Sequence, residues 1–235
     1  MPVPENRASP DAIVINTSGG LTGGDEISLA ARWQSGTSAA LCSQAAEKIY
    51  RSSGGQAVVS NRLDVQEGAS AEWLPQETII FNQARLCRKC EVSVAGGGRF
   101  LGLETVVFGR AAMGEEVNSG DVRDGWRIFR AGRLVYADVF HIDGVISARL
   151  DRSAIGACAR AFGTILLIAG ENLVALVEQL REVFVMARGR AAATQWNGVL
   201  AVRFLARDSE ILRHDMVLAL SILRGRRPLP RPWNC

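Results

Sequence analysis

The sequence predicts a mainly β protein that forms a single domain over residues 1–235, with two α-helices in its C-terminal half. Three observations support this prediction. Apolar residues alternate with other residues in many short segments of the first two-thirds, which is the pattern of half-buried strands. Glycine-rich turns separate many of these segments. After about Gly170 the apolar spacing becomes that of amphipathic helices.

The expected strands begin near residue 12. In ISLAARW, Ile27, Leu29, Ala31 and Trp33 alternate with other residues and form one apolar face. Similar segments are AIVIN, AALCS, QAVVSNRLDV, SAEWL, TIIF, CEVSV, FLGLETVVF, WRIFR and LVYADVFHI. The turns between them include SSGG, QEGA, AGGGR, NSGD and RAGR. No strict repeat period joins these segments, so spacing alone does not predict a regular solenoid.

Two helices and an intervening strand are expected near the C-terminus. In ENLVALVEQLREVFVMA an apolar stripe runs from Leu173 to Phe184 at helical spacing. A second helix begins after Asp208, a suitable N-cap, and ends near Gly225. VLAVRFLA predicts a strand between the two helices. This run and ILLIAG are almost continuously apolar, which favours an exposed face for a protein partner.

Composition excludes several classes of protein. The net charge of +3 gives no case for nucleic-acid binding. The longest apolar stretch, around FGTILLIAG, is shorter than the roughly 20 residues that span a bilayer. The start lacks a signal-peptide pattern, and the five cysteines are scattered, so we expect a soluble, cytoplasmic protein without a disulfide framework. The basic end RGRRPLPRPW is expected to be a solvated tail.

The segment NTSGGLTGGDEI, residues 16–27, combines four glycines with an acidic pair. A phosphate loop would need Lys and Ser or Thr after the last glycine, but Asp25 and Glu26 follow Gly24. Two interpretations remain. The segment is a tight turn between strands, or a backbone crossing that holds carboxylates at a fixed place.

No set of residues predicts catalysis. Cys87 and Cys90 in CRKC lack the second pair of a structural zinc site, and on a strand they point to opposite faces. His141 and His214 have no partner motif, and no nucleophile elbow is present. The only enzymatic alternative is a hydrolase with a carboxylate pair, for which no motif is identifiable.

Three acidic residues lie inside or beside apolar segments. Glu104 is in FLGLETVVFG, Asp138 in LVYADVF, and Glu77 between LPQ and TIIF. A carboxylate in an apolar strand costs free energy unless it is paired or faces water. Each therefore points to the outward face of its strand, or belongs to an internal polar path.

Five segments, in order, resemble the urease accessory protein UreD (UreH) family. They are SGGLTGGD, SQAAEKIYRS, AEWLPQETIIFNQA, FGRAAMGE and RAGRLVYAD, and the end LRGRRPLPRPW is similar as well. The resemblance covers roughly residues 12–233. The chain departs from the family at Cys42-Ser43-Gln44, where a Thr-Thr-Gln run is common, and at Glu47, where Thr is common. The family usually carries several more strands before the GGD segment, and we expect these to be missing here.

The resemblance implies a wide, helically wound β structure and a scaffold, not an enzyme. Its direct partner would be UreF, with UreG joining through UreF and the complex docking on apo-urease. Two such subunits would occur in one assembly, as a dimer of heterodimers. No cofactor would be permanently bound, and nickel would pass through in transit. The alternative is a general β-rich interaction module without a metal role.

The resemblance also suggests site residues. A transient nickel path would be lined by Asp25, Glu26, Glu104, Glu115 and Asp138, with Glu77 as a further candidate. The glycine-rich turn would aim the first two inward, and oxygen ligands would release nickel more readily than thiolates. Structural or partner-binding roles are expected for Gly19, Gly20, Gly23, Gly24, Gln44, Lys48, Tyr50, Arg51, Gln76, Glu77, Gly109 and Arg110.

Overall fold

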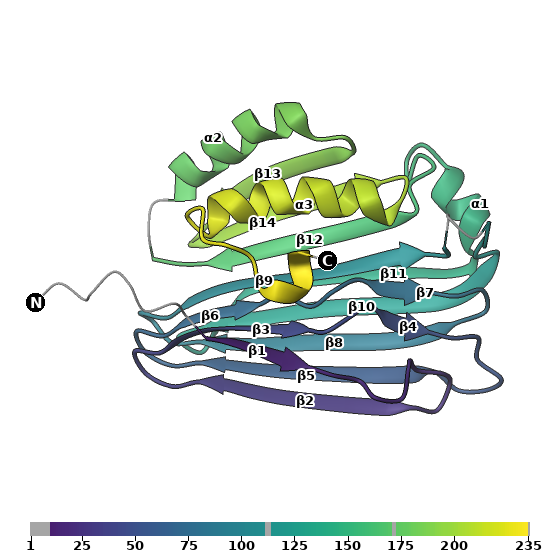
Figure 1. Cartoon of the computed structure of the whole chain (residues 1–235), viewed down its shortest axis with the longest axis horizontal. Coiled ribbons are helices and arrows are strands. Elements are labelled where there is room, and N and C mark those ends of the chain that lie inside the picture. The colour runs from purple at the N-terminus through teal and green to yellow at the C-terminus, as the bar shows by residue number, and fades with distance from the viewer. Residues whose placement is uncertain (1–9, 111–113, 171–172, 235) are drawn as a thin grey trace, which may run out of the picture.

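A computed structural model describes residues 10–110, 114–170 and 173–234. These residues form a nine-stranded and a five-stranded sheet that lie face to face (Figure 1). The larger sheet has the order β1-β3-β6-β9-β12-β14-β13, with β7 also beside β9 and β4 beside β7. The smaller sheet has the order β11-β10-β8-β5-β2. The strands are β1 (Asp11–Val14), β2 (Glu26–Trp33), β3 (Ser38–Ser43), β4 (Glu47–Ile49), β5 (Ala57–Val65), β6 (Ser70–Trp73), β7 (Thr78–Ile80), β8 (Arg85–Val94), β9 (Arg99–Phe108), β10 (Ser119–Arg130), β11 (Arg133–Val145), β12 (Ala161–Ile168), β13 (Arg190–Trp196) and β14 (Val199–Ala206).

The chain winds helically between the two sheets, which confirms the expected architecture. The strands β1, β3, β6 and β9 pair in parallel in the larger sheet, and β2, β5, β8 and β10 pair in parallel in the smaller one. Glu26 is level with Val58, Val58 with Cys87, and Cys87 with Arg123. Successive windings therefore differ in length, which is why the sequence shows no strict period.

Two of the three described helices cover the outer face of the larger sheet, and the first packs beside β10 and β11 of the smaller sheet. The helices are α1 (Ile146–Asp151), α2 (Leu173–Val183) and α3 (Ser209–Leu223), with 3-10 turns η2 (Phe184–Met186) and η3 (Arg231–Asn234). In Figure 1, α2 and α3 lie over β12, β13 and β14. The predicted α2 stripe is buried at Leu173, Val177 and Leu180. The predicted N-cap is also confirmed, because Asp208 accepts a 2.8 Å hydrogen bond from the Ile211 amide.

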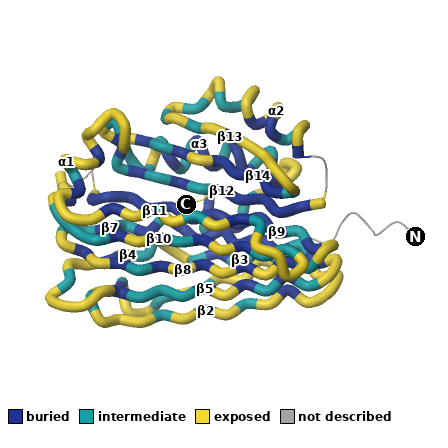
Figure 2. The backbone as a smooth tube through the Cα atoms, turned by 180° about the vertical axis from the view of Figure 1, so that it is seen from behind, coloured by how far each residue is buried: buried dark blue, intermediate teal, exposed yellow. Residues whose placement is uncertain are grey.

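The two apolar runs near the C-terminus are interior strands. ILLIAG lies mostly in β12, and VLAVRFLA forms β14. Both strands lie between the helices and the rest of the sandwich, and the buried residues concentrate there (Figure 2). The prediction of an exposed partner face on these runs is wrong, because burial on both sides of the sheet produces the same continuous apolar pattern. Local sequence patterns do not predict β4, β12, β13 or α1.

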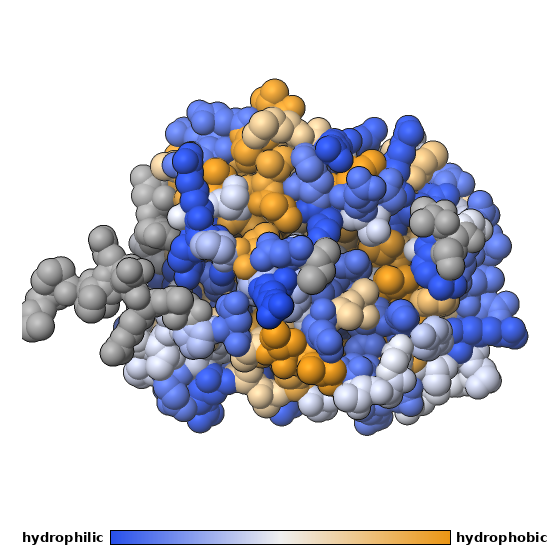
Figure 3. Space-filling view, viewed as in Figure 1, coloured by the Kyte–Doolittle hydropathy of each residue, from blue (hydrophilic) through white to orange (hydrophobic). Residues whose placement is uncertain are grey.

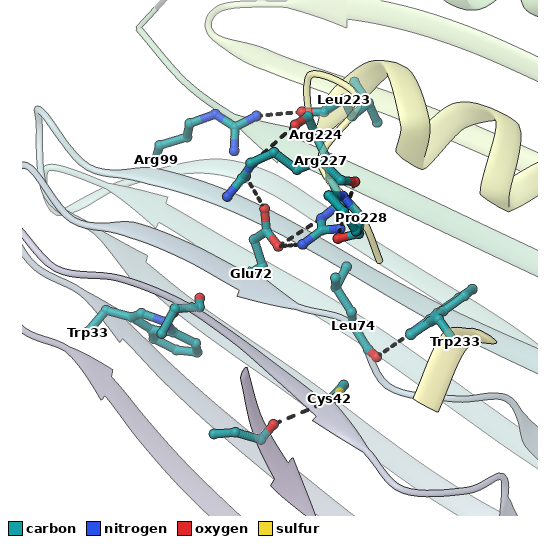
Figure 4. Close-up of polar contacts among 12 residues, drawn as sticks. Trp33, Cys42, Glu72, Leu74, Arg99, Leu223, Arg224, Arg227, Pro228 and Trp233 are labelled. Carbon is teal, nitrogen blue, oxygen red and sulfur yellow. Dashed lines mark hydrogen bonds and ion pairs between the residues drawn. The ribbon is translucent and has the colours of Figure 1, made fainter. Parts of the chain in front are cut away.

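The basic C-terminal segment is folded back on the larger sheet, not solvated. Arg224 and Arg227 both pair with the buried carboxylate of Glu72 on β6 (Figure 4). Beyond them, the Trp233 indole donates a 2.9 Å hydrogen bond to the Leu74 carbonyl and is only 6% exposed. The segment therefore fastens the end of α3 to β6. Within the described ranges, the helices are too short or too polar to cross a membrane.

Candidate functional site

The glycine-rich segment forms a turn that stacks on the next winding of the chain. The Leu21 amide donates to the Lys48 carbonyl at 2.7 Å, and the Tyr50 amide donates to the Leu21 carbonyl at 2.7 Å. A Cβ on Gly20 would lie 2.7 Å from the Lys48 carbonyl oxygen, and Gly20 has a φ of +147°. Only glycine fits such a close approach of two backbones. The tight-turn interpretation of this segment is correct.

Asp25 serves the same turn. Its carboxylate accepts a 2.8 Å hydrogen bond from the Thr22 amide, and its own amide donates to the Thr22 carbonyl. Asp25 and Glu26 are both exposed. The prediction that the turn aims these two carboxylates inward is therefore wrong. Gly19 and Gly24 have positive φ with open space around them, whereas a Cβ on Gly23 would collide with the Ser52 side chain and the Gly54 carbonyl.

Three of the family-like segments meet at Phe81, just beyond β7. The Tyr50 ring lies 4.9 Å from the Phe81 ring, and the Arg110 guanidinium lies 4.8 Å from the same ring centroid. Arg110 also pairs with Glu115 at 2.8 Å. Gly109, with a φ of +76°, turns the chain beside them. Glu115 is thus held at this end of the sandwich by a cation that the same loop supplies.

The remaining residues assigned a structural or partner role lie in or beside β3, β4 and β7 of the larger sheet. Gln44, Lys48 and Arg51 are exposed. Gln76 is buried and accepts a 2.8 Å hydrogen bond from Arg213, whose guanidinium also lies 3.7 Å from Glu77.

A polar belt crosses the core between the two sheets. On β9 the inward face reads Phe100, Gly102, Glu104, Val106 and Phe108, so a carboxylate interrupts the apolar series at its centre. The same interruption occurs at Arg88 on β8 and Asp124 on β10, and the two residues are level in the sheet. Apolar clusters lie on either side of this level. We call Asn61, Arg88, Glu104, Asp124, Asp138 and Arg203 the polar belt.

Arg88 is the centre of this belt. Its Nη1 lies 2.7 Å from Glu104 Oε2, and its Nη2 lies 2.7 Å from Asp124 Oδ2. The Nε donates to Asp124 Oδ1 at 3.0 Å, so the guanidinium holds Asp124 bidentately. The Trp73 indole donates to the other oxygen of Glu104 at 3.1 Å. The Arg88, Glu104 and Asp124 side chains are each less than a tenth exposed.

Burial and charge set the protonation of this cluster. Burial raises the pKa of Glu104 to about 7, and Asp124 adds to the rise, while Arg88 acts against it. Burial by itself would lower the pKa of the Arg88 guanidinium. The negative charges of Asp124 and Glu104 have the larger combined effect, so the pKa is raised. Burial and then Glu104 also raise the pKa of the Cys90 thiol well above its usual value. Cys90 therefore stays protonated and is a poor metal ligand.

Two cavities flank the cluster and open at opposite edges of the sandwich. The first, of about 250 Å³, lies between β11 of the smaller sheet and β12 and β14 of the larger one. Its walls include Glu104, Asp124, Asp138 and Arg203. The second, of about 290 Å³, lies towards β1 and β2, and its walls include Arg88 and Glu104. Glu104 alone is shared by the described linings of both cavities.

Each cavity has further polar groups. In the first, Asp138 pairs with Arg203 at 2.8 Å, and Arg203 also donates to the Tyr136 hydroxyl. The second cavity is lined by Asn61 and by Gln76, whose buried Nε2 has no hydrogen-bond partner within the described residues. Buried polar groups normally have a hydrogen-bond partner, and the cavity beside this nitrogen is large enough to hold a water molecule as its acceptor.

The structure brings together only part of the expected carboxylate set. Glu104 and Asp138 line one cavity, as the alternation along β9 and β11 allows. Asp25, Glu26 and Glu115 line neither cavity. Sequence reasoning missed Arg88 and Asp124, because each lies at an inward position of a strand whose other face is polar, whereas Glu104 stands out in a continuously apolar segment.

Neither the thiols nor the histidines extend the site. Cys87 and Cys90 lie on β8 at opposite faces of the strand, the first half-buried and the second buried. His141 contacts Asp121 and His214 contacts Asp215, both away from the belt. Among the described residues, groups of three or more His, Cys, Asp or Glu side chains placed to hold a metal ion do not occur.

The described residues form a helically wound β sandwich with a buried ionic cluster between two cavities. Its loops include several of the segments that resemble the UreD family. A family model described as the UreD urease accessory protein matches residues 1–234, and the chain belongs to this family. The UreD of Rhodopseudomonas palustris (strain BisA53) is 44% identical over 232 residues, which is 99% of this chain and 79% of that protein.

Other relatives agree with this assignment. The UreD of Azorhizobium caulinodans is 40% identical over 95% of this chain and 82% of its own length. The UreD of Rhizobium etli is 41% identical over 97% of this chain and 82% of its own length. These relatives are named accessory proteins, so the chain has a role in urease maturation.

Proposed function

We propose that the chain is a non-catalytic scaffold of urease maturation that conducts nickel through the space between its two sheets. The nickel would enter one cavity, pass Glu104 and leave by the other cavity. The observation that carries this proposal is that the buried carboxylate of Glu104 lines both cavities. Oxygen ligands suit transfer because they bind a borderline metal more weakly than thiolates do.

The proposed route contains Glu104 and Asp138 from the sequence-based set, and adds Asp124. The first cavity is lined by all three carboxylates, which a cation would pass in turn. Asp25 and Glu26 are left out, because they are exposed on the turn before β2 and line neither cavity. Nickel is cargo in this account, and no permanently bound cofactor is proposed.

The proposed partners follow from the family. UreF would bind directly, UreG would join through UreF, and the complex would dock on apo-urease in the cytoplasm as a dimer of heterodimers. Exposed apolar surface supports a protein partner near the helices: Figure 3 shows it over α2, and Val185 and Met186 beside this helix are 86% and 60% exposed. Exposed apolar surface favours association in water.

The test is a double substitution, Glu104→Gln with Asp138→Asn, in cells that make urease. The complex with UreF should still co-purify, because both residues lie between the sheets. Urease should then contain less nickel and show lower activity than in cells with the unchanged protein. The matched control is Glu26→Gln, which removes an exposed carboxylate.

Wild-type nickel content in the double variant, with an intact complex, would reject the route and leave an interaction module without a metal role. Loss of the complex in the double variant but not in the control would show that the two carboxylates serve only the fold. Reduced nickel in the Glu26→Gln control would place the route on the outer turn.

A further inference from the structure

The guanidinium of Arg88 lies at the boundary between the two cavities. Arg88 lines the second cavity and Asp124 lines the first, while Glu104 lines both. Arg88 bridges the two carboxylates, with 2.7 Å contacts to each. The guanidinium therefore lies between the two carboxylates, next to the residue that lines both cavities.

The charges in this cluster are not balanced by Arg88 alone. One guanidinium faces the carboxyl groups of both Glu104 and Asp124, so whenever Glu104 is ionised two negative charges share a single positive charge. A divalent cation in the same place would balance both. Because buried charges are stable only when they are paired, a dication can substitute for the guanidinium between these two side chains.

The second cavity has room for the Arg88 side chain if a cation displaces it from between the two carboxylates. Arg88 already lines the second cavity, whose volume is about 290 Å³. Thr78, which accepts a 2.7 Å hydrogen bond from Arg88 Nη1, and Gln76, with its unpartnered amide nitrogen, also line this cavity. Glu47 is a further carboxylate in its wall. A guanidinium that swings into this space would find polar groups and room for water.

We propose that Arg88 is the barrier of the nickel route, and that a divalent cation passes by displacing its guanidinium from between Glu104 and Asp124. The arginine acts as an internal counter-ion that keeps the two carboxylates apart from metal until a cation competes for them. It also prevents tight retention, because the guanidinium returns and expels the ion. This inference rests on the proposed function, which assigns the route to the same cavities.

The test measures Ni²⁺ binding to the purified full-length chain by equilibrium dialysis. Arg88→Gln frees both carboxylates, and we expect it to bind Ni²⁺ at least tenfold more tightly than the unchanged protein. The double variant Arg88→Gln with Asp124→Asn should lose this gain, because only one carboxylate remains. Added Ni²⁺ should also raise the melting temperature of Arg88→Gln, but not that of the double variant.

A folded Arg88→Gln variant with unchanged Ni²⁺ affinity would overturn the proposal and make Arg88 a structural residue only. If Arg88→Gln does not fold, Arg88→Lys replaces it, since Lys keeps a charge but lacks the planar fork that holds both carboxylates. A smaller gain in affinity is then expected, and no gain overturns the proposal. This result does not depend on whether nickel follows the proposed route to urease, because the experiment contains neither urease nor UreF.

Discussion

The Nη1 atom of Arg88 lies 2.7 Å from the Oε2 atom of Glu104, and the two residues come from different sheets. Their contact joins the sheets at the level where the apolar core is interrupted. Removing one partner of such a buried pair is strongly destabilising, whereas the pair itself contributes little net stability. Apolar side chains of similar volume often replace a buried ion pair without loss of stability, so its presence between two cavities is the main structural reason for the proposed role in transport.

Stability should depend on pH through Glu104. Its pKa is about 7 in the folded protein, against an ordinary value of 4.5, because it is buried and lies near Asp124. Between these two values the unfolded chain releases its proton first, so this group's contribution to stability is present below about 4.5 and is lost as the pH rises to about 7. The variant Glu104→Gln has no titrating carboxyl group at this position, so its stability lacks this decrease with rising pH.

Urea unfolding at pH 5 and pH 8 checks this expectation. Between pH 5 and pH 8, the unfolding free energy of Glu104→Gln should rise by on the order of 1–3 kcal/mol relative to that of the unchanged protein. If the unfolding free energy changes equally in the two proteins between pH 5 and pH 8, Arg88 fully compensates the ionised carboxylate.

Gly23 should be far less tolerant of substitution than a glycine in the neighbouring loop. A Cβ on Gly23 would collide with Ser52 and the Gly54 carbonyl, whereas a Cβ on Gly54 would meet nothing within 4 Å. We expect Gly23→Ala to cost roughly 1–3 kcal/mol in unfolding free energy, because two backbones must separate. Gly54→Ala is the matched control and should change stability little. Equal stability of both variants would show that the stacked turns move apart freely.

The C-terminal segment should contribute to the stability of the whole domain. Trp233 is buried, hydrogen-bonds to Leu74, and has the Arg213 guanidinium 4.8 Å from its ring centroid. Trp233→Ala should cost about 3–5 kcal/mol, and Trp233→Phe should cost less because most of the packing remains. The half-exposed Trp196 provides a control, for which Trp196→Ala should have a smaller effect. A denaturant midpoint unchanged by Trp233→Ala would mean that the segment is detached in solution.

Much of the fold is predictable from local patterns, and the limits have physical causes. Alternation identified ISLAARW as a strand, now β2, because one of its faces is exposed. It did not identify β12, since a strand buried on both faces has no polar phase. The surroundings of Trp233 could not be predicted, because its partner Leu74 is distant in sequence and a basic, proline-rich segment is usually solvated.

The site was predictable only where a single residue broke a strong pattern. Glu104 stands out in FLGLETVVFG, but Arg88 stands between charged and polar residues in RLCRKCEV, where its inward direction is hidden. The pairing of Arg88 with Asp124 depends on the register of β8 with β10, which no local pattern specifies. The inward direction expected for Asp25 was wrong, because a glycine-rich turn indicates that backbones come close but does not indicate which way a side chain points.

The central claim is that nickel passes between the two sheets, and filling the first cavity tests it most directly. Thr164 lines this cavity and is level with Glu104 on the neighbouring strand, so Thr164→Phe narrows the passage without removing a charge. Thr164→Val is the matched control of nearly equal size. The measurement is the nickel content of urease purified from cells that carry each variant, with UreF co-purification as the check on assembly. We expect urease with little nickel from Thr164→Phe and a normal content from Thr164→Val, whereas full nickel loading with Thr164→Phe and an intact complex would contradict the route.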